Sequence, residues 1–291
     1  MARRKVEVSR DHVQRLMGTS PQKAVEELIW NAFDAGGHRV DVKLRLNDLG
    51  SVDRLEIADC GPGINPADLD RAFGSIGNSI KVERKVNPDQ RAYHGREGKG
   101  RFKALSLSSK AVWETTYRES GNMLAYAVTL TREAAEYYEA TEPAPATGQS
   151  TGTVVRLDGV DKGHQILARE DIREKLAETF ASYLTSYPSV QLFWDGRQVE
   201  VSKLIEREET LDVLAADDPL GPAQLQVLEW TFKPDGKRLH ICDEQGFSFH
   251  DIPAGVQAPG IEFTAYVRTP RAPEWGDSAR FVTDELDGDV K

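Results

Sequence analysis

The sequence predicts an α/β protein with two domains, on three observations. The chain has 291 residues, and a domain usually has about 100 to 200, so this length favours two domains. Apolar residues recur at helical spacing in 20–35 and again in 169–187. Apolar and polar residues alternate in 38–47, as they do in a strand with one buried face. Helices and strands therefore follow one another along the chain.

The first elements are marked by their ends. Ser20 and Pro21 suit the N-cap and the first position of a helix, which a pair of glycines at 36 and 37 ends. The strand at 38–47 is followed by one at 54–58, and the glycines and proline of 59–63 stop that second strand. Further along we expect a helix at 102–107, strands at 111–117, 123–131 and 153–157, a Pro/Ala/Gly loop before the last of these, a helix at 169–187 and a strand at 190–194.

A domain boundary is expected near residues 200 to 210. There the segment EREET leads into new strand-like material, LQVLEWTF, RLHICDE and IEFTAYVRT. We therefore assign residues 1–204 to one domain and 205–291 to a second, smaller one.

Composition excludes several classes of protein. Lys and Arg number 37 against 47 Asp and Glu, a net charge of −10, which opposes attraction of the whole molecule to nucleic acid or anionic lipid. The two cysteines, Cys60 and Cys242, form no CxxC pair, so neither a disulfide framework nor a structural zinc site is expected. No run approaches 18 apolar residues. We expect a cytoplasmic protein that does not enter a membrane.

The first candidate site lies on the helix after Ser20. Glu27, Asn31 and Asp34 are spaced i, i+4 and i+7, so they share one face. They could form an ordinary solvated stripe, as charged residues on helices usually do. Alternatively, an amide and a carboxylate offer hard oxygen ligands suited to Mg²⁺, and the other carboxylate could act as a general base.

A second candidate is Asp59, followed by Gly61 and Gly63. A carboxylate at a strand end can accept a hydrogen bond from an exocyclic amine such as adenine N6, and the glycines let a flat ligand approach the backbone. Asp-x-Gly is also common in plain turns. Another candidate, the fourth in chain order, is Gly152 with Thr153 at the start of a strand. Taken alone, a Gly-Thr pair is common where a turn leads into a strand.

The third candidate, Gly95 to Lys103, is rich in glycine and positive charge. Gly95, Gly98 and Gly100 lead into a helix, where exposed N–H groups and the helix dipole attract phosphate, and Lys99, Arg101 and Lys103 add charge. Residues 81–103 carry eight Lys or Arg against three acids, a local +5 in a protein of −10. The spacing matches neither the dinucleotide fingerprint nor the P-loop. The whole segment 74–101 lacks any sustained period and is expected to be a functional loop.

Taken in order, these four motifs closely resemble the nucleotide motifs of the GHKL superfamily. That group includes gyrase-type topoisomerases, the ninety-kilodalton heat-shock chaperone, histidine kinases, MutL and the MORC proteins, and the resemblance spans about residues 12 to 195. It implies a two-layer α/β sandwich with a mixed, mostly antiparallel sheet, the Bergerat fold, followed by a smaller α/β transducer-like domain.

The resemblance also implies a role for each motif. Glu27 would activate the attacking water, Asn31 would ligate Mg²⁺, and Asp59 would read adenine with support from Thr153. The segment 74–101 would be the lid over the nucleotide. The remaining residues expected to bind the nucleotide are Asp34, Gly61, Gly63, Gly95, Gly98, Lys99, Gly100 and Lys103.

The function implied is ATP binding and Mg²⁺-dependent hydrolysis that closes the lid and drives homodimerisation, as a conformational switch for an unidentified protein partner. Histidine kinases generally lack a glutamate four residues before the asparagine, so Glu27 favours hydrolysis. The alternatives are a kinase of the histidine-kinase type, an ATP sensor without turnover, and a nucleic-acid-acting ATPase, which the charge of −10 does not favour.

Overall fold

The computed structural model describes residues 2–5, 18, 20–74, 100–148, 150–160, 167–215, 217–218 and 221–272. By their contacts, the residues divide into two compact units. The first consists of Met1–Ile172 with Ser189–Val199, and the second of Arg173–Pro188 with Glu200–Lys291. The division into domains at residues 204 and 205 stays a prediction, and the contacts group the helix before residue 188 with the C-terminal segment.

The first unit contains a mixed sheet. Its strands follow the order β1 (Ala2–Lys5), β6 (Tyr137–Ala140), β5 (Asn122–Thr131), β4 (Ser108–Glu119), β8 (Gly152–Val160), β3 (Val52–Asp59), β2 (Arg39–Leu46), β9 (Gln191–Trp194) and β10 (Arg197–Gln198), with β7 (Ala144–Pro145) paired to β5. β2 and β9 run parallel, and the other pairs are antiparallel. This is the mostly antiparallel sheet that was predicted, although the short strands β1, β6, β7 and β10 were not foreseen.

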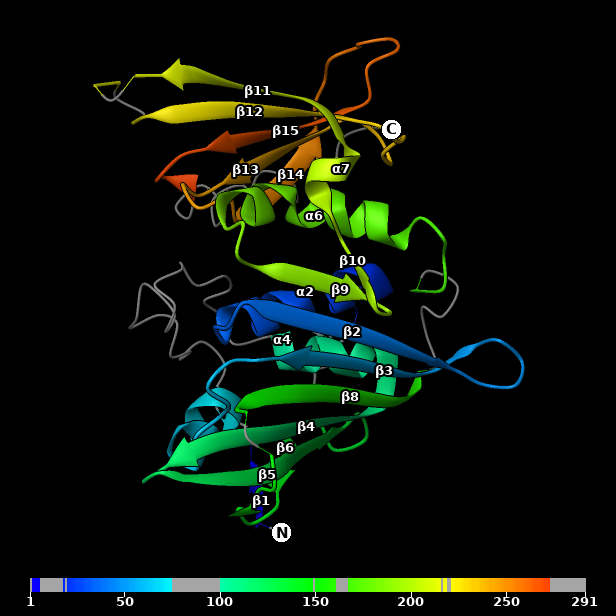
Figure 1. Cartoon of the computed structure of the whole chain (residues 1–291), viewed down its shortest axis with the longest axis vertical. Helices are drawn as coiled ribbons and strands as arrows, with labels where there is room; N and C mark the ends of the chain where they lie inside the picture. Colours follow the sequence, from blue (N-terminus) through cyan, green and yellow to red (C-terminus); the bar gives the residue numbers. More distant parts are fainter. Residues whose placement is uncertain are drawn as a thin grey trace. The chain divides into compact units, whose positions relative to one another are not determined.

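Helices α2 (Pro21–Asp34) and α4 (Gly100–Leu107) lie side by side on one face of this sheet (Figure 1). The hydroxyl of Ser20 accepts a hydrogen bond from the N–H of Lys23, which caps α2 as expected. A short 3-10 helix, η1 (Pro66–Asp68), and a π-helical turn, η2 (Asp70–Gly74), follow β3. Helices on one face of a mixed sheet make the predicted two-layer α/β sandwich, which is confirmed.

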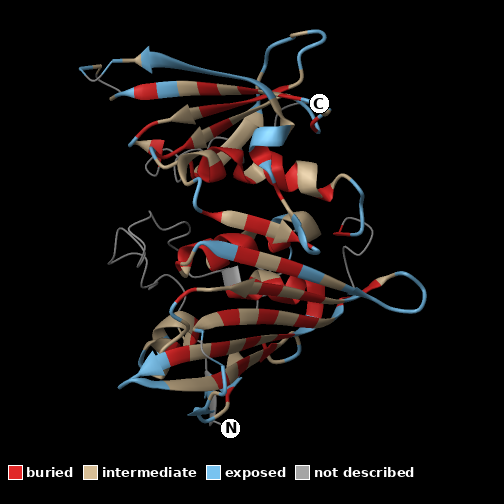
Figure 2. Cartoon of the chain, in the orientation of Figure 1, coloured by how far each residue is buried: buried red, intermediate tan, exposed pale blue. Residues whose placement is uncertain are grey.

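Side chains alternate along the central strands between the helical layer and solvent. On β4, Ala111, Trp113, Thr115 and Tyr117 are buried, while the residues between them are partly exposed. Figure 2 shows the same alternation of buried and intermediate residues along β8. Because successive side chains of a strand point to opposite faces, the buried set is the one that packs under α2 and α4. The core of the first unit therefore lies between the sheet and the helices.

The second unit pairs α6 (Ile172–Ser186) with a separate sheet. The strand order is β11 (Ile205–Leu214), β12 (Ala223–Trp230), β15 (Phe263–Arg268), β13 (Arg238–Cys242) and β14 (Ser248–Pro253), and α7 (Val201–Leu204) precedes β11. Hydrogen bonds from Tyr266 to the carbonyl of Glu178 and from Arg268 to Ser182 join the sheet to α6. The segment EREET, expected at a boundary, lies inside β11, and β14 was not foreseen. In the described part of the chain, no helix combines the length and the apolar character needed to cross a membrane.

Candidate functional site

The polar face of α2 is more enclosed than an ordinary solvated stripe. Asp34 is 4% exposed, and the side chain of Glu27 is 19% exposed. Asn31 is also partly buried. The apolar residues of the helix, among them Leu28 and Phe33, are buried against the rest of the unit and fix the direction of this face. A carboxylate, an amide and a second carboxylate are therefore held in one line at the edge of the helical layer.

An ion pair joins α2 to α4. Nζ of Lys103 lies 2.9 Å from Oε2 of Glu27. Lys103 is in the first turn of α4, so the structure brings the third motif of the sequence next to the first. The sequence foresaw Lys103 as a nucleotide ligand, but not that it would contact the carboxylate expected to activate water.

The second and fourth motifs also meet, at the end of β3. Oδ1 of Asp59 accepts hydrogen bonds from the backbone N–H of Gly61 at 2.9 Å and of Thr153 at 3.1 Å. The expected support from Thr153 therefore involves its backbone. Its hydroxyl contacts that of Thr115, with 3.1 Å between the two Oγ1 atoms.

Thr115 is a site residue that sequence reasoning missed. Its side chain is buried, and Oγ1 accepts a hydrogen bond from the N–H of Ile64 at 2.8 Å. It thereby links β4 to the glycine segment after Asp59 and to Thr153. A threonine at an inward position of a strand carries no sequence signal of this role, because only the pairing of β4 with β8 places it there.

The environment of Asp59 favours its neutral form. Protein atoms surround the carboxyl group, although the residue keeps part of its surface exposed. Burial raises the pKa of Asp59 to about 7, against the opposing effect of the two backbone N–H groups. Both of these hydrogen bonds go to Oδ1, so Oδ2 keeps its capacity to accept a bond from a ligand.

The glycines near Asp59 are required by close packing of the backbone. A Cβ at Gly61 would lie 2.6 Å from the carbonyl oxygen of Ala35, and one at Gly152 would lie 2.3 Å from that of Asp59. Gly63 has a φ of +77°, and its Cβ would lie 2.1 Å from the carbonyl oxygen of Thr116. Close approach of the backbone therefore requires glycine at Gly61 and Gly63 in the loop after β3 and at Gly152 at the start of β8.

The glycine-rich third motif is described only from its C-terminal end. Gly100 is the first residue of α4. Gly95, Gly98 and Lys99 lie outside the described residues, as does most of the expected lid, 75–99. Arg101 was expected to add charge for phosphate, but its side chain is buried and donates to the carbonyl of Ala72 at 2.8 Å, and burial lowers its pKa to about 10. It ties α4 to the turn η2.

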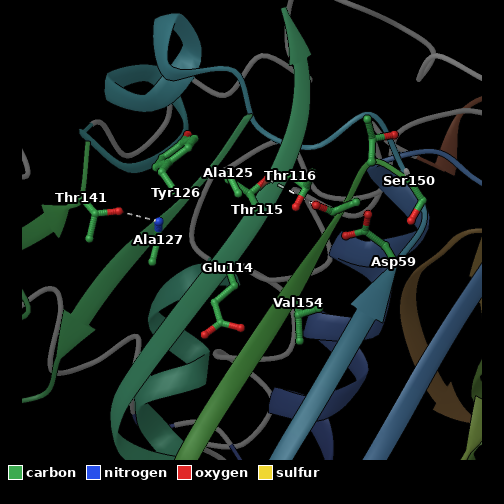
Figure 3. Close-up of a pocket in the computed structure, with 12 residues that line it drawn as sticks. Asp59, Glu114, Thr115, Thr116, Ala125, Tyr126, Ala127, Thr141, Ser150 and Val154 are labelled. Carbon is green, nitrogen blue, oxygen red and sulfur yellow. Dashed lines mark hydrogen bonds between the residues drawn. The ribbon is translucent and has the colours of Figure 1, made fainter. Parts of the chain in front are cut away.

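A cavity of about 570 Å³ opens beside Asp59 (Figure 3). Its lining includes Glu114, Thr116 and Val154, which alternate with the buried residues of β4 and β8 and so belong to the sheet face turned away from α2 and α4. Thr141, the residue after β6, also lines the cavity and accepts a hydrogen bond from the N–H of Ala127. The cavity thus shares Asp59, Thr115 and Gly152 with the candidate site, but its lining includes no residue of α2 or α4.

Comparison with protein families gives a match to this region. The model for the histidine kinase-, DNA gyrase B- and HSP90-like ATPases matches residues 19–158. That range contains all four motifs. This part of the chain belongs to the GHKL superfamily. As a GHKL domain it binds ATP, and its two-layer fold is the one expected for the superfamily. No curated protein matches the chain.

Proposed function

We propose that this GHKL domain hydrolyses ATP in the presence of Mg²⁺. The observation that carries the proposal is the position of Glu27 on α2. Its carboxylate is largely enclosed, four residues before Asn31, and in contact with a lysine of the glycine-rich motif. A carboxylate in such a place, on the same helix face as a neutral oxygen ligand, is suited to take a proton from water beside a phosphate.

The adenine end of the proposed site is Asp59. Oδ2 is free to accept a hydrogen bond from the exocyclic amine of adenine, while Oδ1 is fixed by Gly61 and Thr153. An acceptor held in this way selects a base that carries an amine at that edge. The carboxyl group must be ionised to accept in this manner, so nucleotide binding would lower its pKa from about 7.

The metal end of the proposed site is Asn31. Among the described residues no group of three or more His, Cys, Asp or Glu could hold a metal ion by itself. Mg²⁺ is usually held by one or two protein oxygens together with substrate phosphates and water, so a single amide oxygen fits a metal that arrives with ATP. When bound, Mg²⁺ would neutralise charge that develops on the phosphates.

The remaining parts of the proposal rest on the sequence motifs. The basic segment 74–101 would close over the phosphates, and closure would favour association of two chains, so that the nucleotide state controls a conformational switch. Gly95, Gly98, Gly100 and Lys99 would surround the phosphates with backbone N–H groups and positive charge.

The test is steady-state release of phosphate from ATP, with Mg²⁺ and with the metal chelated. We expect Mg²⁺-dependent release that Glu27→Gln lowers by roughly 10² to 10⁴-fold, the usual contribution of general-base catalysis. Glu26→Gln is the matched control, because a step of one residue turns the side chain about 100° around the helix, and Glu26 accepts a hydrogen bond from Gln22 instead. Hydrolysis should persist in this control.

Other outcomes would replace the proposal. Transfer of labelled phosphate to a protein side chain would identify a kinase, and binding of ATP without turnover would identify a sensor. Loss of hydrolysis in Glu26→Gln but not in Glu27→Gln would show that the motif had been assigned in the wrong register.

A further inference from the structure

Lys103 and Glu27 are in contact, although the proposed function gives them different roles. Lys103 would bind phosphate, and Glu27 would accept a proton from water. The ammonium of Lys103 lies 2.9 Å from the carboxylate of Glu27. A carboxylate that accepts from an ammonium is a weaker base than one that does not, because the positive charge stabilises its ionised form.

The two side chains are held on rigid, buried elements. Leu28 beside Glu27, and Ala104 and Leu105 beside Lys103, are almost fully buried. The paired side chains themselves are 19% and 27% exposed, so solvent screens their attraction less than it would at an open surface. The pair is therefore a fixed feature of the interface between α2 and α4 in this state.

Lys103 is also in the first turn of α4, the end of a helix that attracts anions. An ATP phosphate arriving there would carry more negative charge than one carboxylate and would offer several oxygens. The ammonium then has a better partner within its own turn.

From this placement we propose that Lys103 exchanges partners during the cycle. In the absence of nucleotide it holds the carboxylate of Glu27, and on ATP binding it moves to the phosphates and releases Glu27 to activate water. Lys103 is thus a positioning residue that restrains the general base until a phosphate is present. This inference rests on the proposed function and adds a regulation of the same site.

A double-mutant cycle on nucleotide affinity tests the exchange. Binding of the imido analogue of ATP with Mg²⁺ is titrated in the wild type, Glu27→Gln, Lys103→Met and the double variant. With Lys103 present, Glu27→Gln removes the competitor for the ammonium, so we expect about three- to tenfold tighter binding. In the Lys103→Met background the same substitution should change affinity much less. Repulsion between carboxylate and phosphate acts in both backgrounds and cancels in the cycle.

Three controls separate this exchange from a structural ion pair. Lys103→Arg keeps the charge and should keep the coupling to Glu27. Glu26→Gln should show no coupling to Lys103→Met. Adenosine, which has no phosphate, should bind with no coupling at all, whereas damage to the fold would affect both ligands.

An equal effect of Glu27→Gln in both backgrounds would overturn the inference while leaving ATP binding intact. Failure of the wild-type protein to bind the analogue would instead overturn the proposed function, and the exchange with it. The two failures are thus distinguishable in one set of titrations.

Discussion

Asp59 combines an enclosed carboxyl group with a pKa near neutrality, and this makes nucleotide binding sensitive to pH. Burial raises the pKa of Asp59 to about 7, so the acid form accumulates as the pH falls below that value. In the proposed site adenine requires the carboxylate as acceptor, and the affinity for ATP should therefore decline below pH 7, by about tenfold for each pH unit once the acid form dominates. Titration of a fluorescent ATP between pH 5 and 8 measures this.

Asp59→Asn is the matched variant for that prediction. An amide can place a donor where the adenine amine needs an acceptor, so affinity at pH 8 should fall by about 1.5 to 3 kcal/mol. The variant should also lose the pH dependence due to Asp59 and keep only that of the ATP phosphates. An unchanged affinity in Asp59→Asn would remove Asp59 from adenine recognition.

At the same scale, the resemblance to the GHKL motifs predicted one contact of the candidate site. Asp59 and Thr153 are 94 positions apart, yet the motif order predicted that they would act together, and they do meet. Thr115 and the pairing of Lys103 with Glu27 were missed, because both depend on which strand or helix becomes a neighbour in space. Sequence spacing reports neighbours along one element, not neighbours across two.

The conformation of the loop between β3 and η1 depends on one glycine, Gly63. Gly63→Ala should be strongly destabilising, since a positive φ costs roughly 1 to 2 kcal/mol and the new Cβ would also be forced against the carbonyl oxygen of Thr116. Gly50→Ala is the control, because Gly50 has a φ of +74° but no atom within 4 Å of its Cβ position.

Thermal unfolding separates the two costs at Gly63. In a domain of this size 1 kcal/mol shifts Tm by about 2 to 4 °C. We expect the Tm to fall by about 2 to 4 °C in Gly50→Ala and by at least twice as much in Gly63→Ala. Equal shifts in the two variants would mean that the backbone near Thr116 moves at no cost.

The second unit holds two buried titratable groups whose effects on stability oppose each other. Burial lowers the pKa of His240 from 6.5 to about 4, so its contribution to stability is present above pH 6.5 and is lost as the pH falls toward 4. Burial raises the pKa of Glu178 from 4.5 to about 7, so its contribution is present below pH 4.5 and is lost as the pH rises through 7.

As far as these two groups decide it, their effects oppose each other and nearly cancel between about pH 4.5 and 6.5, so the stability of this unit should vary little over that range. Differences in Tm between each variant and the wild type across pH 4 to 8 measure their contributions. In His240→Asn only the effect of Glu178 remains, so stability should fall as the pH rises from 4.5 to 7. In Glu178→Gln only the effect of His240 remains, so stability should fall as the pH falls from 6.5 to 4. A difference in Tm that does not vary with pH in either variant would contradict the assigned cause.

Elements with a strong period were predicted from the sequence, and elements without one were not. The pattern from Ser20 to Asp34 gave α2 with its cap, since apolar spacing, the N-cap and the following glycines agree. Strand β11 was missed because Ile205–Leu214 is acidic and exposed along most of its length, so no buried face imposes an alternation of apolar residues. Its strand conformation comes from pairing with β12, which the local sequence does not encode.

For the whole molecule, the family match covers residues 19–158, and the second unit lies entirely outside that range. The resemblance implies that this unit is a transducer, which would convert the nucleotide state into association of two chains. Its sheet and its helix α6 bury polar groups such as Gln226 and Glu178 in hydrogen bonds, an arrangement that specifies one packing. The sequence of this unit offers no motif from which its role could be derived, so the assembly must be measured.

Association driven by ATP makes a prediction that follows from linkage alone. If nucleotide binding favours the dimer, then the dimer must bind nucleotide more tightly by the same factor. The apparent Kd of the imido analogue with Mg²⁺ should therefore decrease as protein concentration rises. Sedimentation of the same samples should show the monomer converting to a dimer over the same range. Asn31→Ala is expected to weaken Mg²⁺-ATP binding itself and should abolish both effects, while Glu27→Gln, which is expected to slow hydrolysis, should form the dimer with ATP. An affinity independent of protein concentration, with an unchanged sedimentation coefficient at saturating analogue, would mean that the nucleotide state controls something other than dimerisation.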